Sequence, residues 1–87
     1  MSKTKLVDLK VKIDKKSFDL IQNKCFEKSI FWNESGAIKR QYNEDIFCLY
    51  FRAESNTLQY GKYEYNFNFD KAKEVTIDDF LKRLFNE

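Results

Sequence analysis

Two pairs of adjacent carboxylates have the residue types and spacing for acid–base or metal chemistry: Glu44 with Asp45, and Asp78 with Asp79. Neighbouring carboxylates can divide the roles of general acid and base, or hold a metal ion. The first pair is typical of a polar turn. The second falls in the first turn of an expected helix, where the helix dipole favours negative charge. Structure rather than chemistry therefore accounts for both pairs.

The other reactive groups form no catalytic set. The chain has no histidine, which removes the commonest general base and metal ligand and excludes a Ser–His or Cys–His pair. Gly36 and Gly61 belong to no phosphate-binding motif. We therefore predict a non-enzyme with no catalytic residue, no metal site and no cofactor.

The two cysteines, Cys25 and Cys48, lie within apolar runs. Such cysteines usually behave as small buried hydrophobes. The sequence leaves open whether the fold brings them together as a disulfide.

Aromatic and basic side chains are the remaining candidates, and they indicate binding. Tyr, Trp and Arg are the preferred anchors of protein interfaces. The predicted partner-binding residues are Trp32, Lys39, Arg40, Tyr42, Arg52, Tyr60 and Tyr63. The alternative is that exposed rings stack on nucleic acid bases beside a lysine-rich face. The lysines of that face are Lys10, Lys12, Lys15 and Lys16. A core between sheet and helices would also use these rings, and it is the commoner outcome.

Length and charge set the class of molecule. Eighty-seven residues make a single domain, residues 1–87. The net charge of +2 does not by itself indicate nucleic-acid binding. Residues 1–28 nevertheless carry eight lysines and four acidic groups, so a basic N-terminal face is possible. The stretch "MSKTKLVDLK" has no apolar core of the kind found in secretory signals, so we expect it not to be one, and no apolar run approaches the length of a membrane span. We expect a cytoplasmic protein.

The periodicity of apolar residues predicts the elements that would position these side chains. They are a strand at 7–13, a helix at 15–28, a short strand ending near 36, a possible hairpin arm at 37–42, a strand at 46–51, strands at 57–61 and 62–69, and a C-terminal helix from about 76. At the last helix Thr76 and Asp79 have the spacing of a capping box, and Val75 and Phe80 that of a hydrophobic staple.

These elements predict an α+β fold: an antiparallel sheet of four to five strands, one helix after the first strand, and a C-terminal helix packed on the sheet. The strand at 46–51 is apolar on both faces, which is typical of a central strand. If both helices lie on one face, the other stays partly bare and offers an interface. A homodimer or a protein target is the resulting hypothesis.

The order of short motifs adds a biological setting. The chain has "FWNESG", then an aromatic strand, "LQYG", and finally "KEVTIDDFL". This resembles small proteins of unknown function from tailed bacteriophages, which show a Trp, a "YG" step and a closing "K-E-[IV]-[ST]-x-x-[DE]-[FL]-L". The match covers about residues 18–84, while "YEYNFNF" and the lysine-rich first strand are less typical.

The resemblance implies an accessory protein that works in the host cell. Such a protein would bind and disable a host or defence component, for example a nuclease, a toxin or a CRISPR effector. The leading hypothesis is inhibition by stoichiometric binding. The alternatives are an RNA- or single-stranded-DNA-binding protein, and a sponge that sequesters a signalling nucleotide between tyrosines and basic groups.

Overall fold

The computed structural model describes residues 7–85, and two of its strands follow the apolar pattern of the sequence. In β1 (Leu9–Lys12), Leu9 and Val11 are buried in the main core. In β3 (Cys48–Arg52), both pleat faces are buried, because Leu49 and Phe51 join the same core while Cys48 and Tyr50 face the other side. The prediction that this strand is central is confirmed.

Five strands form a mixed sheet in the order β2-β4-β3-β1-β5. At its centre, β3 pairs antiparallel with β1 and with β4 (Thr57–Gly61). At its edges, β2 (Phe31–Trp32) runs parallel to β4, and β5 (Lys73–Glu74) runs parallel to β1. The prediction of a purely antiparallel sheet is therefore wrong. Because β1, β3 and β4 fill the centre of the sheet, β2 and β5, which each follow a helix in the chain, can join the sheet only at its edges. The direction of the chain as it leaves each helix then makes the pairing parallel.

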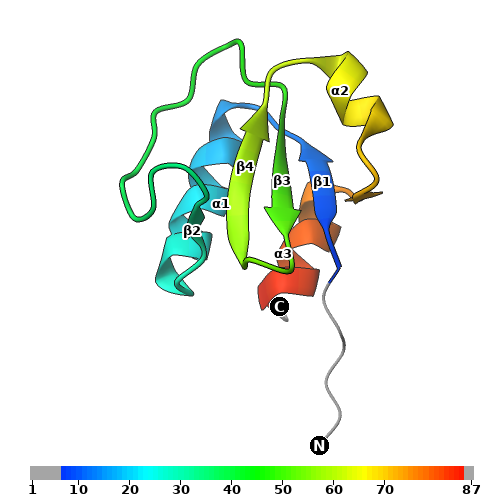
Figure 1. Cartoon of the computed structure of the whole chain (residues 1–87). Helices are drawn as coiled ribbons and strands as arrows, with labels where there is room; N and C mark the ends of the chain where they lie inside the picture. Colours follow the sequence, from blue (N-terminus) through cyan, green and yellow to red (C-terminus); the bar gives the residue numbers. More distant parts are fainter. Residues whose placement is uncertain (1–6, 86–87) are drawn as a thin grey trace, which may run out of the picture.

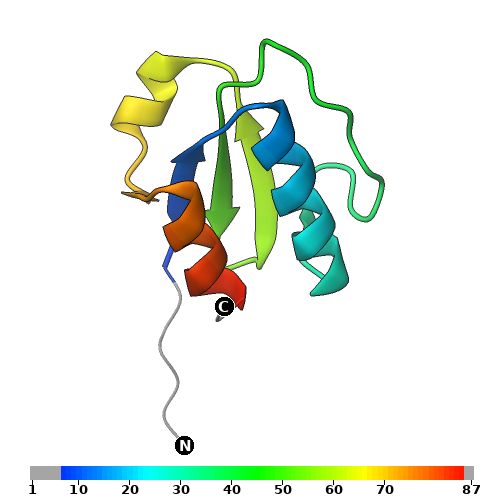
Figure 2. The ribbon, with the colours of Figure 1, turned by 180° about the vertical axis from the view of Figure 1, so that it is seen from behind.

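Two helices cover one face of the sheet (Figure 2). The first, α1 (Lys15–Glu27), begins after Asp14, whose carboxylate accepts a hydrogen bond from the Ser17 N–H at 2.9 Å. The C-terminal helix, α3 (Ile77–Phe85), follows Thr76, whose hydroxyl accepts one from the Asp79 N–H at 3.1 Å. The expected helix after the first strand and the expected terminal helix are both present, with side-chain caps at their starts.

The segment predicted as a strand at 62–69 is instead a third helix, α2 (Glu64–Phe69). Figure 1 shows it at one end of the sheet, next to β1, and its packing is with the sheet face that α1 and α3 leave open. The Phe67 ring is fully buried and packs with Cys48 and Tyr50. A helix sends Phe67 inward and turns Tyr65 and Phe69 outward, whereas a strand would place all three on one face.

Lys10 explains why residues 64–69 form a helix although their alternating pattern predicts a strand. Its side chain is 6% exposed, and its ammonium donates hydrogen bonds to the carbonyl oxygens of Phe67 and, at 2.9 Å, of Asp70. The ammonium also lies 4.7 Å from the centre of the Phe67 ring. Carbonyls at the end of a helix lack partners within it, so a cation there stabilises the helix. This contact is long-range and leaves no trace in the local sequence.

The expected hairpin arm at 37–42 is also wrong. The chain turns at Gly36, which has φ +64° and exchanges two backbone hydrogen bonds with Trp32. It then continues to β3 without a regular element. This segment has no strand partner. Side-chain contacts, described below, fix its position instead.

Cys25 and Cys48 are free thiols buried on opposite sides of the sheet. Burial raises the pKa of the Cys25 thiol to about 12 and also raises that of Cys48. Neither thiol is therefore equipped as a nucleophile.

The helical assignment of α2 makes a prediction with a built-in control. Phe67→Ala should lower the free energy of unfolding by about 3–5 kcal/mol, because it empties a fully buried ring site. Phe69→Ala, two positions away and 73% exposed, should change it by less than about 0.5 kcal/mol. Urea denaturation measures both values. Equal losses would contradict the helix, since a strand would bury both rings together.

Candidate functional site

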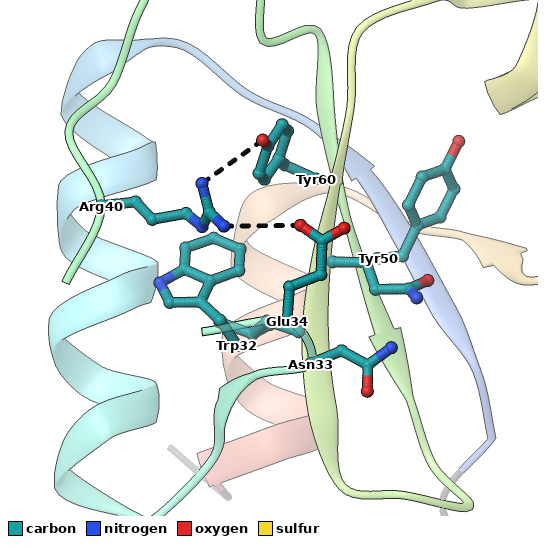
Figure 3. A pocket seen from close by; sticks show the side chains of 8 residues that line it. Trp32, Asn33, Glu34, Arg40, Tyr50 and Tyr60 are labelled. Atoms are coloured by element: carbon teal, nitrogen blue, oxygen red, sulfur yellow. Dashed lines mark hydrogen bonds and ion pairs between the residues drawn. The ribbon is translucent and has the colours of Figure 1, made fainter. Parts of the chain in front are cut away.

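A cleft of about 280 Å³ lies at the edge of the sheet where β2 and β4 meet the segment before β3 (Figure 3). We call it the Arg40 cleft. Its lining residues are Trp32, Asn33, Glu34, Arg40, Tyr50, Leu58, Gln59 and Tyr60. The strands supply the aromatic groups and Gln59, and the irregular segment after β2 supplies Asn33 and the two charges.

A buried glutamine of α1, Gln22, fixes this irregular segment. Its side-chain oxygen accepts hydrogen bonds from the Arg40 N–H and from the Trp32 indole Nε1–H, both at 2.7 Å. Its side-chain nitrogen donates to the Arg40 carbonyl oxygen at 3.0 Å. The side chain of Gln22 is only 3% exposed. It binds both backbone polar groups of Arg40 and also orients Trp32, the only tryptophan of the chain.

The Arg40 guanidinium itself is weakly bound. It donates to the Tyr60 hydroxyl and to the Glu34 carboxylate, each at 3.4 Å, beyond the usual range for a charged hydrogen bond. Its Nε–H is buried and has no hydrogen-bond partner within residues 7–85. The guanidinium also lies 5.0 Å from the centre of the Tyr60 ring, which gives a cation–π contact. The backbone of Arg40 is fixed, while neither terminal nitrogen of its guanidinium makes a short hydrogen bond among the described residues.

Arg52, on the open face of the sheet, shows the opposite arrangement. Its guanidinium binds both Asp70 oxygens, at 2.7 and 3.1 Å, and its Nε–H donates to Gln59 at 2.8 Å. It also lies 3.6 Å from Asp8 and stacks on Tyr50. The hydrogen bonds from Arg52 lower the pKa of the Asp70 carboxyl. Arg52 therefore anchors the segment after α2.

A second surface consists of two neighbouring rings that α2 turns to solvent, Tyr65 and Phe69, and the exposed ring of the N-cap residue Tyr63. We call Tyr63, Tyr65 and Phe69 the α2 aromatic patch. These side chains are 64%, 70% and 73% exposed, and the rings of Tyr65 and Phe69 lie 4.8 Å apart. Tyr63 also lines a larger hollow of about 670 Å³ together with Tyr42, Lys12 and the acidic pair Glu44–Asp45.

The structure separates the predicted partner-binding residues into groups. Trp32, Arg40 and Tyr60 meet in the Arg40 cleft, and Tyr42 and Tyr63 share the larger hollow. Lys39 is exposed and donates to Asn23 at 2.9 Å, while Arg52 belongs to the network around Asp70. Gln22, Tyr65 and Phe69 are not among the predicted partner-binding residues. The amphipathic pattern alone could have placed Gln22 near the buried side of α1, but not its partners.

The predicted lysine-rich face is not continuous. Lys10 is buried under α2, so the expectation that its ammonium is exposed for phosphate contact is wrong. Lys12 and Lys16 are exposed, and Lys15 is exposed but paired with Asp19 at 3.2 Å.

Within residues 7–85, no group of three His, Cys, Asp or Glu side chains is placed to hold a metal ion. No helix in this part of the chain has the length and apolar character to cross a bilayer. Comparison of the chain with protein-family models, curated proteins and solved structures found no match. The likeness to phage accessory proteins therefore stays a prediction, and the site has to be interpreted from its own geometry.

The role of Gln22 can be tested against a matched glutamine. Gln22→Ala should lower the free energy of unfolding by about 1–3 kcal/mol, because it leaves the buried Trp32 indole N–H and the two part-buried backbone groups of Arg40 without partners. It should also change the emission of Trp32, which loses its indole hydrogen bond. Gln41→Ala, at an exposed position of the same segment, should alter neither. Unchanged fluorescence in the first variant would contradict the assignment.

The Arg52–Asp70 pair predicts a pH dependence. Its contact with Arg52 places the pKa of folded Asp70 below the ordinary value of 3.8, so the pair stabilises the fold above that pH. This stabilisation is lost as pH falls through the folded pKa. Asp70→Asn should therefore lower the free energy of unfolding by about 1.5–3 kcal/mol at pH 7 and by less near pH 2. Asp45→Asn, at an exposed turn, is the control. A pH-independent difference for Asp70→Asn would contradict the ion pair.

Proposed function

We propose that this chain is a non-enzymatic interaction protein that acts by stoichiometric binding to another protein. The α2 aromatic patch supports this most directly, because three large rings exposed by more than three-fifths add little to the stability of the fold. Exposed apolar groups gathered on one element usually mark an interaction site. Tyrosines are among the preferred anchors of such sites.

The patch sits on a rigid base. Phe67 is fully buried beneath it, and Lys10 and Arg52 hold the end of α2 through its carbonyls and through Asp70. A partner would therefore meet rings whose supporting backbone is already ordered, which lowers the entropic cost of binding.

For the setting, we propose a phage-encoded inhibitor of a bacterial host or defence factor, acting in the host cytoplasm. This rests on the resemblance of the motifs in residues 18–84 to phage accessory proteins. Inhibition by adhesion needs shape and anchor residues rather than reactive groups, and the aromatic patch and the Arg40 cleft provide such anchors.

Nucleic-acid binding is the weaker candidate. Lys12 lies with Lys62 and Tyr63 at the larger hollow, which would suit a backbone phosphate beside a ring. Glu44 and Asp45 line the same hollow and oppose a polyanion, and the burial of Lys10 removes one of the four lysines of the predicted face.

An affinity capture from lysate of infected bacteria tests the proposal. The bait variants are Tyr65→Ser/Phe69→Ser, and Leu20→Ser as a control that removes a 42%-exposed leucine from α1. We expect the native chain to capture one protein, in an amount equimolar with the bait, even after nuclease treatment. The Leu20→Ser control should capture the same amount. The double variant should not capture it. Its recovery should depend little on salt.

Three results would contradict this. One is recovery of RNA or DNA alone, with binding that weakens steeply as salt rises. Another is equal capture by the double variant. The third is a dimeric mass in light scattering that becomes monomeric in the double variant, which would assign the patch to a second copy of the chain.

A further inference from the structure

The Arg40 guanidinium has more hydrogen-bonding capacity than the fold uses. A guanidinium carries five N–H donors, and two of its nitrogens here reach an acceptor, each at 3.4 Å. By comparison, the Arg52 guanidinium of the same molecule makes three hydrogen bonds between 2.7 and 3.1 Å to groups of the protein itself. The difference is not one of poor positioning, because Gln22 fixes the Arg40 backbone on both its polar groups.

We infer that the Arg40 cleft is a receptor for a single carboxylate. Its natural source, which rests on the function proposed above, is an acidic side chain or the terminal carboxylate of the bound protein. The chemistry of the cleft itself can be tested without that partner.

The charge of the cleft favours a carboxylate over a phosphate group. Among the described residues that line it, Arg40 is the only cation and Glu34 the only anion, so the cleft is close to neutral. A phosphomonoester near neutral pH brings nearly two negative charges and would find one cation beside an acidic group. A carboxylate brings one charge, and its two oxygens match the planar fork of an arginine.

Glu34 already places a carboxylate beside the Arg40 guanidinium, but at a long distance. Its carboxylate lies 3.4 Å from the Arg40 guanidinium, yet its side chain is 75% exposed. An ion pair so exposed contributes little and is easily replaced. A carboxylate from outside can take its place and gain the shorter contacts that Glu34 does not make.

The size and walls of the cleft define the rest of the ligand. About 280 Å³ is just below the range of 300–1,000 Å³ that is common for drug-sized ligands, so it suits one side chain or a small acid. Of the apolar residues that line the cleft, Trp32 and Leu58 are buried in the main core and the ring of Tyr60 is partly exposed, so Tyr60 is the surface that an apolar or aromatic stem would contact.

Nuclear magnetic resonance of the arginine Nε–H groups tests this on the full chain. Arg40, Arg52 and Arg83 are its three arginines, so three signals are expected, and Arg40→Lys identifies the first by its loss. The protein is titrated with sodium benzoate, with acetate and with inorganic phosphate at constant ionic strength. We expect benzoate to shift the Arg40 signal saturably at millimolar concentration, about tenfold below acetate, while Arg52 and Arg83 stay in place.

Three variants make distinct predictions. Glu34→Gln removes the competing carboxylate and should tighten benzoate binding about two- to fivefold. Glu54→Gln, which makes the same change of charge at an exposed turn, should not alter it. For Arg40→Lys, read from the shifts of backbone amides around the cleft, the saturable response should disappear while the rest of the spectrum stays folded.

Several outcomes would overturn the inference: no shift of the Arg40 signal up to about 100 mM benzoate, equal shifts of all three arginine signals, phosphate acting at lower concentration than benzoate, or no change in Glu34→Gln. None of these depends on the partner. A failed capture experiment and a failed titration are therefore separate results.

Discussion

The side-chain amide of Gln22 is the contact on which the candidate site depends. The chain between β2 and β3 is long and has no regular element, a kind of connection that compact domains keep mainly where it has a function. Backbone groups in such a segment need partners other than a strand. Gln22 provides them for Arg40 and also holds Trp32. A single helical residue thereby converts an irregular segment into the wall of a cleft.

The two faces of the sheet have different roles, one in stability and the other in exposing groups that could bind a partner. One face, covered by α1 and α3, contains the main core and gives the fold its stability. The open face is closed only in part by α2, through a small cluster of Cys48, Tyr50 and Phe67 and through the polar network of Arg52 with Asp70. This thinner cover has a consequence for function, because rings remain accessible on the outer side of α2. The Arg40 cleft lies elsewhere, at the β2–β4 edge of the sheet, where Gln22 of α1 holds its wall.

The sequence predicted what depends on local pattern and not what depends on distant contacts. The alternation in β1, the two apolar faces of β3 and the caps of α1 and α3 all follow local rules, and those elements are present. The segment "YEYNFNF" alternates as a strand does, but Lys10, far away in the chain, stabilises it as a helix. The direction of the edge strands was missed because apolar pattern carries no information on pairing partners. The identities of Arg40, Trp32 and Tyr60 followed from residue type alone, whereas for Gln22 the amphipathic pattern of the helix carries no information on its partners.

Hydrogen exchange at the Arg40 amide tests the central claim most directly, because this N–H has no strand or helix partner and depends on Gln22. If Gln22 fixes the segment, the Arg40 amide exchanges as slowly as amides in β3, while those of the exposed neighbours Lys39 and Gln41 exchange rapidly. An Arg40 amide that exchanges at the rate of its neighbours would show that the segment is not held, and that the cleft is not prepared in advance for a ligand.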